Sequence, residues 1–323
     1  MTRPRTSRKL LVRGLQLAVV GVALWFAFAQ LGRHWTEFRR LAANVHPQWT
    51  GVLGSALLVL ATYALLVESW RTLVRAWGDH LGFADAARIW AVSNLGRYVP
   101  GKLWSIGAMG VLAQRAGVSP VAAAGSAIVG TVVNLAASVA VVFLAGGGAA
   151  AALFPTLGPW RAWLPILGAA GLIATPLLLP IATRAAARIT GRDLPTVRVP
   201  PHVLFVVVAA NVASWVGYGL AFRWLAASLV PVSGGNHLAY VAVFAGSYLA
   251  GYLALVVPGG IGVRELFLTA ALTRLHLADL PTATLIAVAS RLWLTVLELV
   301  PGLLFLARGT ARPLPRPTSD AKA

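Results

Sequence analysis

A proline and three glycines occur within five residues at the point where one long apolar segment ends and another begins. The sequence there is PGGIGVRE, from Pro258 to Glu265. Backbone N–H groups at the start of a helix attract anions, and the planar guanidinium of Arg264 offers two parallel donors that suit a phosphate group. Glu265 can serve as its counter-charge or as a helix cap. We expect an anion site that also uses Gly259 and Gly260; the alternative is an ordinary interfacial turn.

Two further charges lie deep inside the last apolar segment. Arg291 and Glu298 are seven residues apart, so a helix places them on nearly the same face, about 10 Å apart along its axis. A charge at membrane depth costs several kcal/mol unless it is paired or lines a cavity. We therefore expect both side chains to face the interior, toward Arg264 and Glu265, and to line one polar cavity. A purely structural ion pair is the alternative.

A second basic pair flanks a related element in the first half of the sequence. Arg97 and Lys102 stand on either side of a Val-Pro-Gly element at 99–101. They either form a second, positively charged entrance to the binding site, or they extend to the membrane surface. In the second case the charged ends reach the headgroups while the aliphatic parts of the side chains stay in apolar surroundings. Asn134 and Asn211 also lie inside apolar segments, where we expect them to form hydrogen bonds between helices.

The elements that must position these residues are transmembrane helices. Of the 323 residues, 58% are hydrophobic and only 11% are charged, whereas soluble domains carry about a quarter charged residues. A bilayer core of roughly 30 Å needs about 20 apolar residues as helix, and a helix satisfies its own backbone groups in lipid. The sequence thus predicts an all-α, polytopic membrane bundle. The expected spans are 14–32, 48–67, 120–146, 162–182, 202–230, 238–257 and 282–307.

Two apolar segments interrupted by Pro, Gly and Arg, at 84–118 and 261–277, are predicted to be broken or re-entrant helices. Counting 261–277 as a crossing gives about eight transmembrane helices. Residues 68–85 mix tryptophans with charges and are expected to form an interfacial linker. The expected organisation is a basic cytoplasmic N-terminus (1–13), a single transmembrane domain (14–307) and a disordered cytoplasmic tail (308–323).

Basic residues gather at both ends of the chain. Five of them precede the first expected span, and four follow the last. Because loops rich in Lys and Arg stay in the cytoplasm, we expect both termini to be cytoplasmic and the protein to be a multi-pass component of the cell membrane.

The two halves of the sequence resemble each other weakly. In each half, a Val-Pro-Gly element is followed by a short apolar helix that ends near an arginine, and then by a Pro-led span. Pro100 and Pro258 are 158 residues apart, and Pro120 and Pro281 are 161 apart. Paired Pro/Gly breaks in two halves indicate a transport-type binding site; coincidence is the alternative.

The net charge of +18 would also suit a nucleic-acid-binding protein. The basic residues instead lie between apolar runs, a pattern typical of contact with anionic lipid headgroups, so no nucleic-acid partner is expected. The chain has no cysteine, and its six histidines lack metal-ligand spacing. Because dinucleotide, phosphate-loop and metalloprotease motifs are also missing, we expect neither a metal nor a cofactor.

The segment from Val257 to Glu265, followed by a Pro-led span with Ser290-Arg291-Leu292, resembles the transmembrane domain of lysylphosphatidylglycerol synthases, a family that includes stand-alone flippase-like proteins. The element at 99–101 is similar to the family's first-half motif, and the resemblance covers roughly residues 10–307. In full-length synthases a cytosolic domain transfers lysine from its tRNA to phosphatidylglycerol, and the chain here stops sixteen residues after its last expected span. The resemblance implies translocation of an anionic, aminoacylated or glycosylated lipid between leaflets, without a catalytic activity of its own.

Two other functions are open from the residues alone. A membrane-embedded transferase acting on a lipid-linked substrate would have to rely on Glu68, Glu265 or Glu298, because no pair of aspartates is present. A non-catalytic partner would assemble with a separate lipid synthase or glycosyltransferase. Membrane phospholipids or lipid-linked substrates are the expected partners in every case.

Overall fold

Four long helices form the body of the protein. The computed structural model describes residues 46–98, 103–146, 199–232, 237–254 and 260–307, with a few positions between 158 and 174. The long helices have 27 to 29 residues and are long and apolar enough to cross a membrane, which confirms four of the expected spans. Of the other three expected spans, 238–257 forms the shorter, 17-residue apolar helix His237–Leu253. The remaining two, 14–32 and most of 162–182, lie outside the described residues. The four helices are α3 (Trp49–Ala76), α6 (Pro120–Gly146), α9 (Pro201–Leu229) and α12 (Leu280–Ala307).

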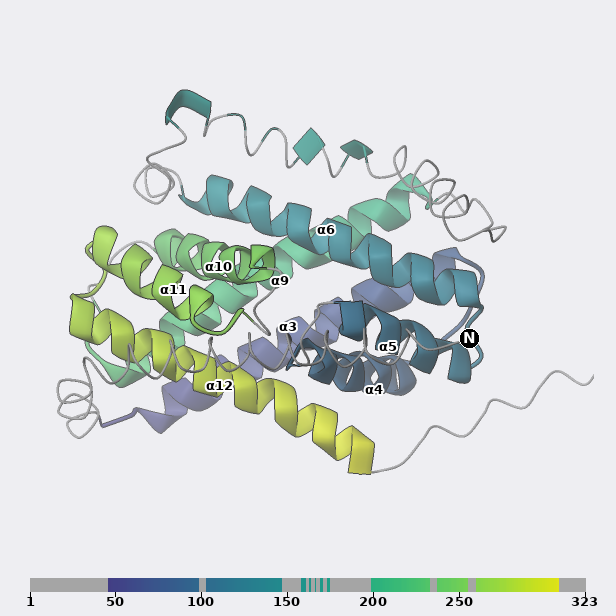
Figure 1. Cartoon of the computed structure of the whole chain (residues 1–323), viewed down its shortest axis with the longest axis horizontal. Helices are drawn as coiled ribbons and strands as arrows, with labels where there is room; N and C mark the ends of the chain where they lie inside the picture. Colours follow the sequence, from purple (N-terminus) through teal and green to yellow (C-terminus); the bar gives the residue numbers. More distant parts are fainter. Residues whose placement is uncertain are drawn as a thin grey trace, which may run out of the picture.

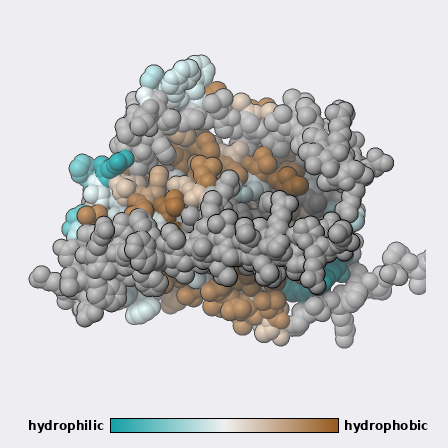
Figure 2. Space-filling model, in the orientation of Figure 1, coloured by the Kyte–Doolittle hydropathy of each residue, from teal (hydrophilic) through white to brown (hydrophobic). Residues whose placement is uncertain are grey.

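The surface of these helices explains why they belong in lipid. Helix α6 contains no charged residue, and Arg223 is the one arginine of α9. Large apolar side chains such as Leu53, Ile128 and Phe205 are more than half exposed. Figure 2 shows hydrophobic patches on the visible face, with hydrophilic residues toward the ends. Such a surface is unfavourable in water and suits a bilayer, so the protein is a multi-pass helical membrane protein, as predicted.

The first broken segment forms a helical hairpin. It consists of α4 (Phe83–Asn94), the 3-10 turn η1 (Leu95–Tyr98) and α5 (Leu103–Arg115). Helices of 12 and 13 residues are about 18–20 Å long, too short to cross the bilayer core. The backbone N–H and the hydroxyl of Ser119 donate to Asp79 Oδ2, at 3.0 and 2.6 Å, so the chain enters and leaves this hairpin at one end of the bundle. The predicted break within 84–118 is confirmed, and this geometry favours a re-entrant segment.

A second hairpin forms from α10 (His237–Leu253) and α11 (Val263–Arg274). The two helices lie side by side between one end of the bundle and its middle (Figure 1). Gly260, with φ of +67°, packs against Gly251, and a Cβ at Gly260 would stand 2.8 Å from the Gly251 Cα. With 12 residues, α11 is too short for a crossing. Residues 261–277 therefore fit the description of a re-entrant helix. They do not fit the alternative of an additional membrane crossing.

The second helix of each hairpin ends in the same kind of turn. The N–H of Val118 bonds to the carbonyl of Ala113, and 159 residues later the N–H of Leu277 bonds to the carbonyl of Leu272. In both turns the residue before the donor is left-handed, with φ of 91° and 52°. This is the helix-ending Schellman pattern. The hairpins enter from opposite ends of the bundle (Figure 1), as expected for an inverted repeat, and the internal repeat predicted from sequence is therefore structural.

The expected interfacial linker at 68–85 is wrong over most of its length. Helix α3 continues to Ala76, and only a short turn precedes α4. Glu68 accepts from Arg71 at 2.5 Å and from Arg75 at 3.0 Å on the same helix, so the negative charge of Glu68 is neutralised within α3. Trp70 is 5% exposed and donates from Nε1 to Ser126 Oγ of α6 at 2.9 Å. The tryptophan therefore packs between helices and does not anchor an interface.

Candidate functional site

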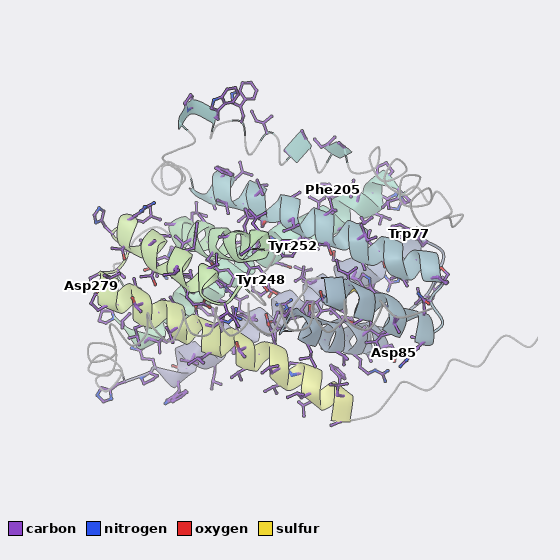
Figure 3. The ribbon with its side chains drawn as sticks, viewed as in Figure 1. Trp77, Asp85, Phe205, Tyr248, Tyr252 and Asp279 are labelled. Atoms are coloured by element: carbon purple, nitrogen blue, oxygen red, sulfur yellow. The ribbon has the colours of Figure 1, made fainter. Side chains whose placement is uncertain are left out.

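A cavity of about 250 Å³ lies where the two hairpins meet the four long helices. Most of its lining is apolar or aromatic, and Figure 3 places Tyr248 and Tyr252 near the middle of the bundle, with Asp85 and Asp279 toward opposite ends. Four of its lining residues are charged: Arg97, Arg264, Arg291 and Glu298. A cavity that joins charges to an apolar wall can hold a molecule with both a polar and an apolar part.

Arg264 is the most buried of the charged groups. It is the second residue of α11, after Gly262, whose φ of +83° turns the backbone into the helix. Its side chain is 4% exposed, and its guanidinium carbon lies 4.9 Å from the ring centre of Phe244 and 4.5 Å from that of Tyr248. These cation–π contacts hold the planar group in place.

One edge of the Arg264 guanidinium lacks hydrogen-bond partners among the described residues. Its Nε and Nη2 atoms are buried and have no hydrogen-bond partner within the described part of the chain. These two nitrogens share one edge of the guanidinium, and their N–H bonds point in parallel, as needed to bind two oxygens of a phosphate or carboxylate. Buried donors without partners are costly, so this edge is a candidate binding site for an anion.

Glu265 fulfils one of the two roles considered for it, that of a helix cap, and its counter-charge is Arg291 and not Arg264. Its Oε2 accepts from the backbone N–H of Gly262 at 2.6 Å and so caps α11. Its Oε1 lies 3.6 Å from Arg291 Nε of α12. Glu265 thus positions Arg291 and supports the start of α11, while Arg264 faces the cavity.

Arg97 connects the first hairpin to the second half of the protein. Its Nη1 donates to Glu298 Oε1 at 2.5 Å and to the Tyr248 hydroxyl at 2.6 Å, and its Nη2 donates to Asn94 Oδ1 at 2.9 Å. The alternative that Arg97 reaches out to the membrane surface is therefore wrong, because its charge is satisfied inside the bundle. Lys102, predicted to act with it, lies outside the described residues.

Arg291 and Glu298 share one face of α12 and both line the cavity, as predicted. A structural ion pair between the two is not what forms. Arg291 pairs with Glu265 of α11, and Glu298 pairs with Arg97 of η1. Helix α12 is therefore tied by one ion pair to each hairpin.

The two glycines predicted to bind an anion have different outcomes. Gly259 lies outside the described residues. Gly260 is buried against Gly251, so its observed contact is the close approach of the two arms of the hairpin. Gly251 lines the cavity.

Several lining residues were missed by the sequence reasoning. Tyr248 and Tyr252 line the cavity, and Phe244 stacks on Arg264 beside it. The three residues follow one another at every fourth position of α10, which puts them on one helix face, and this spacing was the available signal. The predicted hydrogen bonds of the asparagines are present: Asn134 Nδ2 donates to Asn211 Oδ1 at 2.8 Å. Both asparagines also line the cavity, which the sequence did not indicate.

The fold and the site together define a helical membrane protein with an arginine-lined internal cavity between two opposed re-entrant hairpins. The sequence model of the lysylphosphatidylglycerol synthase TM region matches residues 14–302, and the chain belongs to this family. The family relates the protein to the synthesis or translocation of membrane lipids. Among curated proteins, none matches the chain.

Proposed function

We propose that the protein binds the phosphate of a membrane lipid at Arg264 and moves the lipid between the two leaflets. The observation that supports this most directly is the unpartnered edge of Arg264, formed by Nε and Nη2, at a cavity inside the bundle. The non-bridging oxygens of a lipid phosphate supply the two acceptors that this edge lacks. The apolar part of the lining suits the part of the lipid next to its headgroup.

The architecture supports movement as well as binding. Two hairpins enter from opposite ends and meet at the cavity (Figure 1), so the site lies between two elements that each reach one side of the bundle. In many transporters the substrate site is formed at the junction of inverted repeats, by interrupted helices. Withdrawal of one hairpin at a time would expose the cavity to one side at a time.

The carboxylates favour transport over catalysis. A membrane-embedded transferase would need a carboxylate able to act as a base. Glu298 is engaged by Arg97, and Glu265 faces Arg291 while it caps α11. Among the described residues no group of three or more His, Cys, Asp or Glu could hold a metal ion, so a metal-assisted transfer gains no support from these ranges.

The experiment is leaflet exchange in proteoliposomes with a fluorescent phosphatidylglycerol, read by quenching from outside. Arg264→Gln removes the charge and the donor fork and should slow exchange at least about tenfold, because hydrogen bonds to charged groups contribute roughly 1.5–3 kcal/mol. Arg274→Gln, at the exposed end of the same helix, is the matched control and should exchange lipid like wild type. Normal exchange by Arg264→Gln at equal protein content would refute the proposed function.

A further inference from the structure

Helix α6 contributes an uncharged polar wall to the cavity. Thr131 and Asn134 both line it, are half-buried, and are three residues apart, which puts them on one helix face. The other polar lining residues of α6, Ser126 and Ser138, are at most 1% exposed. Because α6 contains no charged residue, Thr131 and Asn134 are the groups through which this wall can bind the polar part of a ligand.

The amide of Asn134 has hydrogen-bonding capacity to spare. Its Nδ2 donates to Asn211 Oδ1 at 2.8 Å. The Asn211 amide is then fully used, because its own Nδ2 donates to Ser69 Oγ at 3.1 Å and to the carbonyl of Val207 at 2.7 Å. The Oδ1 of Asn134 makes no hydrogen bond within the described ranges. The network therefore fixes Asn134 from one side and leaves its oxygen to accept from a donor.

Thr131 offers an oxygen in the same way. Its hydroxyl donates to the carbonyl of Ala127 at 2.8 Å, so its hydrogen is committed and its oxygen can only accept. Two uncharged acceptors on one wall call for O–H or N–H donors. The oxygens of a phosphodiester are acceptors themselves, so this wall does not suit a second phosphate.

Two aromatic rings connect this wall with Arg264. Trp215 Nε1 donates to the backbone carbonyl of Asn134 at 3.0 Å. The ring centre of Trp215 lies 5.3 Å from that of Tyr248, and the Tyr248 ring centre lies 4.5 Å from the guanidinium carbon of Arg264. All four residues line the cavity. The wall is thus separated from the proposed phosphate site by two rings, whose faces can also contact an ammonium group.

From this arrangement we infer that Thr131 and Asn134 form a second, uncharged subsite, which binds the hydrogen-bond-donating end of a lipid headgroup while Arg264 holds the phosphate. The inference rests on the proposed function, because the two subsites share one cavity. Hydroxyl and ammonium groups both supply the required donors. A headgroup without donors leaves both oxygens of the wall without a partner and gains nothing from them.

The test measures lipid binding to the full chain in detergent, by lipid-induced shifts of the unfolding temperature. Phosphatidylglycerol brings hydroxyl donors and phosphatidylethanolamine brings an ammonium. Phosphatidylmethanol carries the same phosphodiester with no donor beyond it. The variants are Thr131→Val, which replaces one hydroxyl by a methyl group, and Asn134→Leu. Thr273→Val is the matched control, because its hydroxyl makes the same bond to its own helix at 2.8 Å and does not line the cavity.

Wild type should bind at least one of the donor-bearing lipids about threefold to tenfold more tightly than phosphatidylmethanol, as expected for one or two neutral hydrogen bonds. The lipid that is favoured identifies the donor as hydroxyl or ammonium. Both variants should lose this preference while their affinity for phosphatidylmethanol stays the same, and Thr273→Val should keep it. If Asn134→Leu does not fold, because Asn211 then lacks its donor, Thr131→Val carries the test alone.

The outcomes that would overturn the inference differ in what they say about the proposed function. If wild type binds all three lipids equally and Arg264→Gln weakens all of them, the phosphate site stands and the second subsite is refuted. A preference for donors that survives in Thr131→Val and in Asn134→Leu also refutes the subsite. If binding of none of the probes depends on Arg264, the proposed function falls and the second subsite falls with it.

Discussion

Arg97 and Glu298 are 201 residues apart in the sequence, and their side chains form an ion pair of 2.5 Å at the cavity. The pair joins the tip of the first hairpin to the last long helix. Because the Arg97 side chain is 28% exposed and that of Glu298 only 9%, the carboxylate depends more on its partner than the arginine does. The stability of the bundle should therefore respond unequally to changes on the two sides.

Removing Arg97 alone should destabilise the protein more than removing the whole pair. Arg97→Met leaves Glu298 buried without its counter-charge, a situation that costs about 3–5 kcal/mol. Arg97→Met combined with Glu298→Leu removes both charges and should restore much of the lost stability. Thermal unfolding in detergent measures the difference. Equal unfolding temperatures for the single and double variants would show that Glu298 without its partner carries no extra cost.

Arg264→Lys should separate charge from geometry. Lysine keeps the positive charge but cannot form two parallel hydrogen bonds to one phosphate, nor stack as a plane between Phe244 and Tyr248. We expect lipid affinity to fall about tenfold while the protein remains folded. Lipid titration by unfolding temperature checks this, and an unchanged affinity would mean that a point charge suffices at this position.

Gly260→Ala should distort the second hairpin. The residue has φ of +67°, and a Cβ would stand 2.8 Å from the Cα of Gly251. The left-handed backbone and the contact together should cost about 1–3 kcal/mol. Gly107→Ala is the control, because a Cβ there meets nothing within 4 Å in α5, and alanine is favoured over glycine inside a helix by up to about 1 kcal/mol. A Gly260→Ala protein as stable as wild type would contradict the close packing of the two arms.

Orientation in the membrane can be tested with single cysteines, because the chain contains none. Figure 3 places Asp85 and Asp279 toward opposite ends of the bundle, and the exposed residues Ala84 and Leu280 are next to them in sequence. With cytoplasmic termini, a membrane-impermeant maleimide added to intact cells should label Leu280→Cys and leave Ala84→Cys unlabelled until the cells are opened. The reverse pattern would place both termini outside.

The long helices were predictable because each contains a long apolar run with very few charged residues. The span expected at 120–146 is the helix α6 as observed, and that expected at 282–307 begins only two residues late. The linker at 68–85 failed because charge was read as a sign of interface, whereas Glu68 is neutralised by arginines of its own helix. Charge content alone does not distinguish these cases; the spacing of opposite charges along one helix does.

The site was predictable residue by residue but not as a set of partners. Burial cost correctly indicated that Arg291 and Glu298 face the interior. Which group each one meets depends on how separate helices pack, and the pairing of Arg97 with Glu298 spans most of the sequence. Tyr248 was overlooked because a tyrosine in an apolar run costs little and therefore attracts no notice. Its importance comes from contacting both Arg97 and Arg264.

The open edge of Arg264 is held by groups from a single hairpin. Phe244 and Tyr248 belong to α10, and Arg264 itself belongs to α11. The first hairpin touches this arrangement through the hydrogen bond from Arg97 to the Tyr248 hydroxyl, which is separate from the stacking on the tyrosine ring. If the two hairpins part, the proposed phosphate anchor therefore remains assembled and moves with the second hairpin. Access to a bound molecule can then change while its contacts with Arg264 stay the same.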